Sequence, residues 1–292
     1  MTAAGKAETV VRGAPDEAGT EKPEPIIQVR DLVVCYGDRR VIEGVSFDIM
    51  RGEIFVILGG SGCGKSTLLR NLVGLMRPTE GTIHINGQDF TAMSDDERTE
   101  IRKRIGMCFQ GSALFGSMSV GDNVALALRE HTKLEESVIQ TQVRMKLQQV
   151  GLGGCEDYLP SELSGGMKKR AGFARAMAMD PNIIFYDEPS AGLDPIVAAG
   201  LDGLIRRMQS TFSLTSVVVT HEMASVGLIA DRVCFLKNGR VAALGTLDEI
   251  GMSDHPFVKQ FLDRRPEDET QDNEDYLRSL FGDVMLERMQ RE

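Results

Sequence analysis

Apolar residues in the first part of the chain gather in short runs of the length of β-strands. The dipeptide Asn86-Gly87 follows one of these runs and is typical of a β-hairpin turn. Another turn, Arg51-Gly52, separates two further runs. Strands are therefore expected at residues 26–30, 32–35, 41–49, 53–58, 82–85 and 101–109.

Helical periodicity replaces these runs in the middle of the chain. From about residue 116 to residue 179, apolar side chains recur at helical spacing, which we interpret as an inserted helical subdomain. Strands and helices then alternate again, and this alternation predicts a mostly parallel sheet with helices on both faces. The elements expected around the subdomain are helices at 66–73 and 195–208 and strands at 183–186, 216–220, 233–236 and 240–244.

Both ends of the chain depart from this pattern. Residues 1–25 are charged or small and lack the apolar core of a secretory signal, so we expect a disordered tail. Residues 264–292 begin as an acidic linker and continue as an amphipathic helix, expected over 275–289. Two interpretations of this helix stay open, docking on a second protomer or regulator and packing on its own domain. The main domain is expected over residues 26–263.

Charge and composition narrow the functional class. A net charge of −10 argues against a protein that holds nucleic acid on a basic surface. No apolar run approaches the roughly 20 residues that a membrane-spanning helix needs, so we expect a chain that is not itself integral to a membrane. The 5 cysteines show no metal-binding or C-x-x-C spacing, which predicts free thiols in a reducing cytosol.

The chemistry centres on residues 59–67, which read GGSGCGKST. They match the phosphate-binding pattern G-x-x-x-x-G-K-S/T, with an expected strand before it and an expected helix after it. The glycines let backbone N–H groups converge on phosphate oxygens, and the helix N-terminus and Lys65 add positive charge. Ser66 offers a hydroxyl to Mg²⁺. Cys63 is either a redox-sensitive thiol or a small residue tolerated in the loop. The residues expected to contact a nucleoside triphosphate are Gly59, Gly60, Ser61, Gly62, Cys63, Gly64, Lys65, Ser66 and Thr67.

Two acids follow the apolar run at 183–186, namely Asp187 and Glu188. Ligands of open parallel sheets bind at the carboxyl ends of the strands, so this pair is expected to face the phosphate loop. Asp187 then belongs in the Mg²⁺ shell, and Glu188 polarises the attacking water as general base. The alternative, a pair of surface acids at a strand end, is disfavoured by the apolar run before them.

A second expected anion site lies at the start of another helix. Ser164, Gly165 and Gly166 form a turn whose backbone N–H groups face outward from a helix N-terminus. One chain with two such phosphate-binding starts suggests that two copies share each nucleotide.

Seven motifs in order resemble the ATPase subunit of an ABC transporter. The resemblance covers roughly residues 26–245. The motifs are Tyr36, the Walker A loop at 59–67, Gln110, the LSGGM signature at 163–167, the Walker B pair at 187–188, the segment 190–194 and His221. The resemblance implies an α/β P-loop NTPase with a RecA-like core and a mostly parallel sheet, an N-terminal antiparallel β subdomain and an inserted α-helical subdomain. It also implies ATP and Mg²⁺ as ligands.

The same resemblance assigns roles to single residues and to a second copy of the chain. It implies a head-to-tail dimer in which two ATP molecules lie between Walker A of one copy and Ser164, Gly165 and Gly166 of the other. Tyr36 is then the aromatic that stacks on adenine, although a tyrosine at a strand end also packs on its neighbours. Gln110 contacts Mg²⁺ and water and signals to the membrane subunit, Asp194 tunes communication across the dimer, and His221 holds the γ-phosphate.

A departure from the common signature points to a subfamily. Met167 stands where most signatures have glutamine, and both LSGGM and residues 110–115 resemble the Mce/Mla class of lipid transporters. This implies phospholipid as cargo, a separate membrane permease, an Mce-type protein and a small regulatory subunit as partners, and a peripheral position on the cytoplasmic face of the inner membrane. The alternatives are an importer ATPase for a polar solute such as an amino acid, and a non-transport ABC ATPase. The second alternative is disfavoured because no coiled coil, zinc insertion or tandem cassette is visible.

Overall fold

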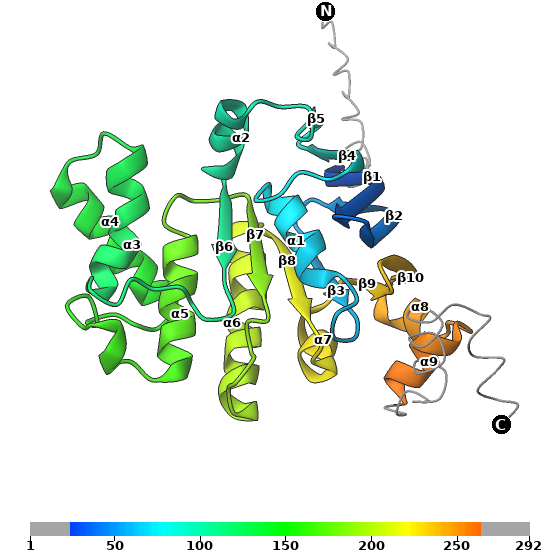
Figure 1. The fold of residues 1–292 in the computed structure, drawn as a ribbon. Coiled ribbons are helices and arrows are strands. Elements are labelled where there is room, and N and C mark those ends of the chain that lie inside the picture. Colours follow the sequence, from blue (N-terminus) through cyan, green and yellow to red (C-terminus); the bar gives the residue numbers. More distant parts are fainter. Residues whose placement is uncertain (1–23, 264–292) are drawn as a thin grey trace, which may run out of the picture.

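The computed structural model describes residues 24–263. The expected N-terminal tail up to residue 23, the acidic linker and the amphipathic helix at 275–289 lie outside the described residues. Two sheets stand side by side, and a group of helices extends from the larger one (Figure 1).

The smaller sheet is antiparallel and has the strand order β2-β1-β4-β5. Its first strand is continuous across the two apolar runs expected at 26–30 and 32–35, because a register shift at Asp31 (φ 46°) absorbs the break in pattern. This sheet is the expected antiparallel β subdomain. Its strands are β1 (Pro25–Tyr36), β2 (Arg39–Met50), β4 (Glu80–Ile85) and β5 (Gln88–Asp89).

The larger sheet has the order β10-β9-β3-β8-β7-β6, and all neighbouring pairs are parallel except β10 with β9. Strands buried on both faces read as continuous apolar runs, which explains why the central strands were predictable. The strands are β3 (Ile54–Leu58), β6 (Ile105–Cys108), β7 (Ile183–Asp187), β8 (Thr215–Thr220), β9 (Arg232–Lys237) and β10 (Arg240–Gly245).

Successive residues of β3 point into two different hydrophobic cores. Phe55 and Ile57 pack with helix α1 (Lys65–Val73) and with the smaller sheet. Val56 and Leu58 belong to a second core formed with helix α6 (Pro195–Phe212) and with the helical subdomain. The sheet is thus covered on both faces, as the alternation of strands and helices predicts.

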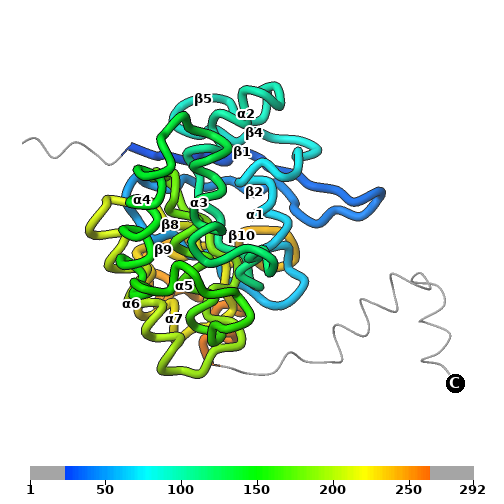
Figure 2. Tube along the Cα trace, turned by 90° about the vertical axis from the view of Figure 1, so that its left-hand side faces the viewer, coloured from blue at the N-terminus to red at the C-terminus, as the bar shows by residue number. Residues whose placement is uncertain are grey.

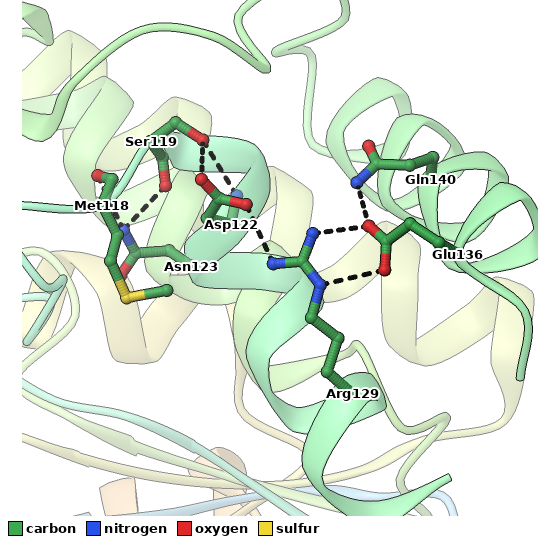
Figure 3. A network of polar contacts seen from close by, with 7 residues as sticks. All are labelled: Met118, Ser119, Asp122, Asn123, Arg129, Glu136 and Gln140. Atoms are coloured by element: carbon green, nitrogen blue, oxygen red, sulfur yellow. Dashed lines mark hydrogen bonds and ion pairs between the residues drawn. The ribbon is translucent and has the colours of Figure 1, made fainter. Parts of the chain in front are cut away.

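The helical subdomain lies at one end of the larger sheet and turns its helices toward the viewer in Figure 2. It comprises α3 (Val120–His131), α4 (Glu136–Gln149), the 3-10 turn η1 (Pro160–Glu162) and α5 (Gly165–Ala176), close to the expected span of 116–179. Arg129 of α3 pairs with Asp122 of its own helix and with Glu136 of α4 (Figure 3). The hydrogen bond from Arg129 lowers the pKa of the Glu136 carboxyl to about 2.

Some elements differ from the sequence-based expectations. The strand expected at 101–109 is shorter, because residues up to Arg102 belong to a helix, α2 (Asp95–Arg102). Ser94 and Glu97 form a capping box at its start, a signal present in the sequence and overlooked. Helices α7 (Met223–Ile229), α8 (Leu247–Gly251) and α9 (Pro256–Leu262) were also not predicted. Between residues 24 and 263, no helix has the length and apolar character to cross a membrane.

Candidate active site

The predicted motifs follow four neighbouring strands at one edge of the larger sheet. The phosphate loop follows β3, His221 follows β8, Asp187 ends β7, and Gln110 comes two residues after β6. Leu58 pairs with Thr220, and Asp187 pairs with Val219, so these strands end at the same level. The carboxyl ends of parallel strands therefore bring the predicted catalytic residues together.

The phosphate loop adopts a backbone that only small residues allow. Gly62 and Gly64 have φ angles of 74° and 107°, in the left-handed region. A Cβ atom on Gly64 would lie 2.8 Å from Ile42 Cδ1, and one on Gly59 would lie 2.7 Å from Cys63 Sγ. The ammonium of Lys65 donates to the carbonyl oxygens of Gly59 (2.8 Å) and Gly60 (2.9 Å), so its charge lies over the loop.

Cys63 is buried inside the loop, and its carbonyl oxygen accepts a hydrogen bond from Gly239 N–H. Burial raises the pKa of its thiol. A reactive cysteine needs a lowered pKa, because the thiolate is the nucleophile. Of the two interpretations from sequence, the structure favours a small residue packed behind the loop.

The Walker B acids stand in different environments although they are adjacent. Burial raises the pKa of the Asp187 carboxyl, and the charge of Glu188 raises it further, while Arg70, Lys65 and Lys169 act in the opposite direction. Glu188 adopts a left-handed backbone (φ 47°), which is uncommon for a residue with a side chain. Its Oε1 lies 2.9 Å from Nδ1 of His221, so the predicted base and the predicted γ-phosphate ligand are in direct contact.

The donor set fits Mg²⁺ better than a metal held by protein groups alone. Within residues 24–263, no group of three or more His, Cys, Asp or Glu side chains is arranged to hold a metal. Mg²⁺ in phosphoryl-transfer sites typically uses one or two carboxylates together with substrate phosphates. The half-buried Asp187 carboxylate, with its pKa raised by desolvation, is a group that gains from a cation of this kind. Ser66, at the exposed start of α1, carries the hydroxyl predicted to complete the protein part of the shell.

Gln110 is exposed, and its backbone is anchored from helix α5. Lys169 Nζ donates to the Gln110 carbonyl oxygen (2.6 Å) and to the Glu188 carbonyl oxygen (3.2 Å). None of the sequence motifs assigns Lys169 a role at this site. No local pattern identifies such a contact, because it joins residues 59 and 19 positions apart.

The signature segment lies beside the segment that contains Asp194. Ser164 caps α5 by accepting a hydrogen bond from Met167 N–H (3.3 Å). A Cβ atom on Gly166 would lie 2.6 Å from Val197 Cγ1, in the first turn of α6. Asp194 caps that helix through Ile196 N–H and Val197 N–H. Among the hydrogen bonds of residues 24–263, none connects Ser164, Gly165 or Gly166 with the phosphate loop of the same chain.

Two further features border the site. Tyr36 ends β1 with 47% of its surface exposed, and its hydroxyl donates to Met76 Sδ (3.4 Å), so its role toward adenine stays a prediction. A cleft of about 790 Å³ opens beside the Glu188–His221 pair. Its walls also include the 190–193 segment, residues 222–224 at the start of α7, and residues of α9 such as Phe261.

Comparison with known sequences identifies the family. Residues 42–191 match the profile described as ABC transporter. The intermembrane phospholipid transport system ATP-binding protein MlaF of Haemophilus influenzae is 44% identical over 81% of this chain and 90% of that protein. MlaF of Escherichia coli K12 is 42% identical over 82% of this chain and 88% of that protein. The probable ribonucleotide transport ATP-binding protein mkl of Mycobacterium leprae is 46% identical over 82% of this chain and 69% of that protein.

Solved structures agree with the fold. A dimeric ATP-binding cassette, MJ0796, in a post-hydrolysis state with ADP and Pi, is 30% identical and superposes with a TM-score of 0.70 over 76% of this chain and 98% of that one. The cassette cbiO1 of Clostridium perfringens, part of the transporter complex cbiONQ, is 33% identical with a TM-score of 0.73 over 82% and 95%. The predicted α/β P-loop NTPase fold is confirmed. The chain belongs to the ABC transporter family and is one of its ATP-hydrolysing cassettes.

Proposed function

We propose that this chain powers the movement of phospholipid across a bacterial envelope, acting as the ATPase subunit of a larger membrane complex. The observation that carries the proposal is its 44% and 42% identity to two MlaF proteins over 90% and 88% of their lengths. Identity over nearly a whole protein includes the surfaces that meet partners as well as the catalytic motifs. The partners are then a membrane permease and an Mce-type protein, and the chain docks on the cytoplasmic face of the inner membrane.

The site geometry supports specific roles within this proposal. Residues 59–67 cradle the phosphates of ATP, and Tyr36 stacks on the adenine. Ser66, Gln110 and Asp187 hold Mg²⁺, which neutralises phosphate charge when bound. Glu188 orients and deprotonates the attacking water. His221, whose Nδ1 lies 2.9 Å from Glu188 Oε1, holds the γ-phosphate.

The proposal includes a homodimer that completes each nucleotide site. The related cassette MJ0796 is dimeric in its structures. In this chain, Ser164 at the N-terminal turn of α5 is exposed. Among the hydrogen bonds of the described residues, none joins it to the phosphate loop of the same chain. A second copy arranged head to tail supplies that turn to the γ-phosphate, with Asp194 beside it.

Ribonucleotide is a second candidate cargo, and a separate observation supports it. The mkl proteins of Mycobacterium leprae and Mycobacterium tuberculosis, named for probable ribonucleotide transport, are 46% and 45% identical to this chain. Identity at the ATPase does not discriminate between these cargoes, because cargo contacts the membrane partners. We place phospholipid first because the MlaF proteins match over more of their own length.

The test is a purification of the tagged full chain from detergent-solubilised membranes of its own host, followed by mass spectrometry of protein, lipid and nucleotide. We expect a multispanning permease, an Mce-type protein and phospholipid above the level found with an unrelated membrane protein from the same extract. A permease recovered with a soluble solute-binding protein, or with ribonucleotide other than ATP and ADP, would overturn the phospholipid proposal. The ATPase assignment would stand in either case.

A further inference from the structure

Helix α5 carries a cation that joins two catalytic segments of the site. We propose that Lys169 is a positioning residue that couples the Q-loop, defined here as residues 110–115, to the catalytic base Glu188. The inference rests on the proposed role of Glu188 and adds a residue that none of the predicted motifs assigns to catalysis.

The first observation is the geometry of the Lys169 ammonium. Its Nζ lies 2.6 Å from the carbonyl oxygen of Gln110 and 3.2 Å from that of Glu188. These residues follow the neighbouring strands β6 and β7, in which Cys108 pairs with Tyr186. A charged donor makes stronger hydrogen bonds than a neutral one. Lys169 therefore holds together the backbone beyond the ends of both strands, where the sheet ladder no longer does.

The second observation is the backbone of Glu188. Its left-handed conformation (φ 47°) is held by surrounding contacts and not by local preference. Its N–H donates to the Val219 carbonyl oxygen, and its own carbonyl oxygen accepts from Ala191 N–H and from Lys169. Loss of the ammonium leaves this peptide freer to rotate, and the direction of the Glu188 carboxylate changes with it.

The third observation is a difference between Lys169 and another cation of α5, Arg175. Arg175, six residues further along α5, donates to the carbonyl oxygens of Ala113 (2.6 Å) and Ser112 (3.1 Å). Both acceptors are Q-loop residues with positive φ angles. Arg175 thus fixes the Q-loop alone, whereas Lys169 fixes the Q-loop and Glu188. Among the hydrogen bonds of residues 24–263, those of the Lys169 side chain join the Q-loop directly to the backbone of Glu188.

The kinetic test uses the full chain, purified with its membrane partners, and the variant Lys169→Met. We expect kcat for ATP hydrolysis to fall on the order of tenfold, because small misplacement of a catalytic group has effects of this size or larger. The dissociation constant for a non-hydrolysable ATP analogue should change less than about twofold, since the described contacts of Lys169 do not include the phosphate loop. Lys169→Arg keeps the donors and should restore most of kcat. Lys168→Met is the matched control on the same helix and should match wild type.

Hydrogen–deuterium exchange provides a readout besides activity. In Lys169→Met, peptides covering 108–115 and 183–190 should both exchange faster, whereas in Arg175→Met only the first should. Exchange that rises in neither peptide, or equally across the whole chain, would overturn the inference, and thermal unfolding identifies a variant that simply fails to fold. Normal kcat in Lys169→Met with an inactive Glu188→Gln would refute the role of Lys169 alone. Normal hydrolysis in Glu188→Gln would refute the proposed base.

Discussion

At the residue scale, the Walker B strand ends in a carboxylate that is costly to the fold without a cation. Asp187 is half-buried, and burial raises its pKa, with Glu188 adding to the effect. A carboxyl whose pKa is higher in the folded state binds more protons there than in the unfolded chain. Stability therefore falls as pH rises from the unfolded pKa, about 3.9, through the folded value.

Asp187→Asn should consequently stabilise the nucleotide-free protein while it abolishes hydrolysis. We expect a melting temperature a few degrees above wild type at pH 7, because the desolvated charge is gone. The difference should shrink as the pH falls toward 4, because the folded-state carboxyl takes up its proton at a higher pH than the unfolded one. Differential scanning fluorimetry from pH 4 to 8 measures this, and a lower melting temperature at pH 7 would contradict the prediction.

The neighbouring acid should behave differently because its role is in chemistry. Glu188→Gln keeps the size of the side chain and the contact with His221, but it removes the base. We expect ATP binding close to wild type, hydrolysis reduced by at least a hundredfold, and a dimer that persists in ATP. Equilibrium binding, phosphate release and sedimentation velocity measure the three quantities. Hydrolysis at the wild-type rate would show that another group activates the water.

At the element scale, the start of helix α3 depends on one buried amide. Asn123 is 0% exposed, and its Nδ2 donates to the carbonyl oxygens of Phe115, Met118 and Ser119, while its Oδ1 accepts from Phe115 N–H. Figure 3 shows this amide beside Met118 and Ser119, the two residues that come directly before α3. The Ser119 and Phe115 carbonyl oxygens also accept backbone hydrogen bonds, from Asn123 N–H and Met118 N–H. Among the hydrogen bonds of residues 24–263, the Phe115 N–H and the Met118 carbonyl oxygen bond with this amide alone.

Asn123→Ala should lower the free energy of unfolding by roughly 2–3 kcal/mol, because it leaves the Phe115 N–H and the Met118 carbonyl oxygen without their partner in a buried place. The control is Gln140→Ala in the same network, where the side chain donates to Glu136 near the surface (Figure 3). We expect less than about 0.5 kcal/mol for that variant. Urea unfolding of the two variants measures the difference. Equal decreases in the free energy of unfolding would show that the buried Asn123 amide stabilises the fold no more than the Gln140 side chain does.

Elements of this protein were predictable from sequence to the degree that their signals are local. The buried strand β3, the phosphate loop and the hairpin at Asn86-Gly87 each carry their signal within a few residues, and all were found. Helix α2 was missed although its capping box is local, because the apolar residues after it favoured a strand. The Lys169 bridge and the contact of Glu188 with His221 depend on which strands are neighbours, and periodicity alone does not determine strand order.

At the scale of the whole molecule, the signature turn at 164–166 makes no hydrogen bond with the nucleotide site of its own chain in the described residues. The same turn packs beside the Asp194 segment. If a second copy supplies this turn, each nucleotide site combines Walker A of one copy with the signature of the other. A substitution in Walker A and one in the signature should then affect ATP hydrolysis differently when one chain of the dimer carries both and when each chain carries one.

This difference gives a prediction for mixed dimers. Lys65→Ala removes the cation over the phosphate loop, and Gly165→Glu places a carboxylate where a γ-phosphate is expected. When one chain carries each change, one site collects both defects and the other is intact, so about half of the wild-type sites remain. When one chain carries both changes and pairs with wild type, every site has one defect. We therefore expect ATP hydrolysis in the first mixture and near-background rates in the second. Differently tagged copies, purified in tandem, measure this, and equal rates in the two mixtures would contradict a nucleotide site shared between copies.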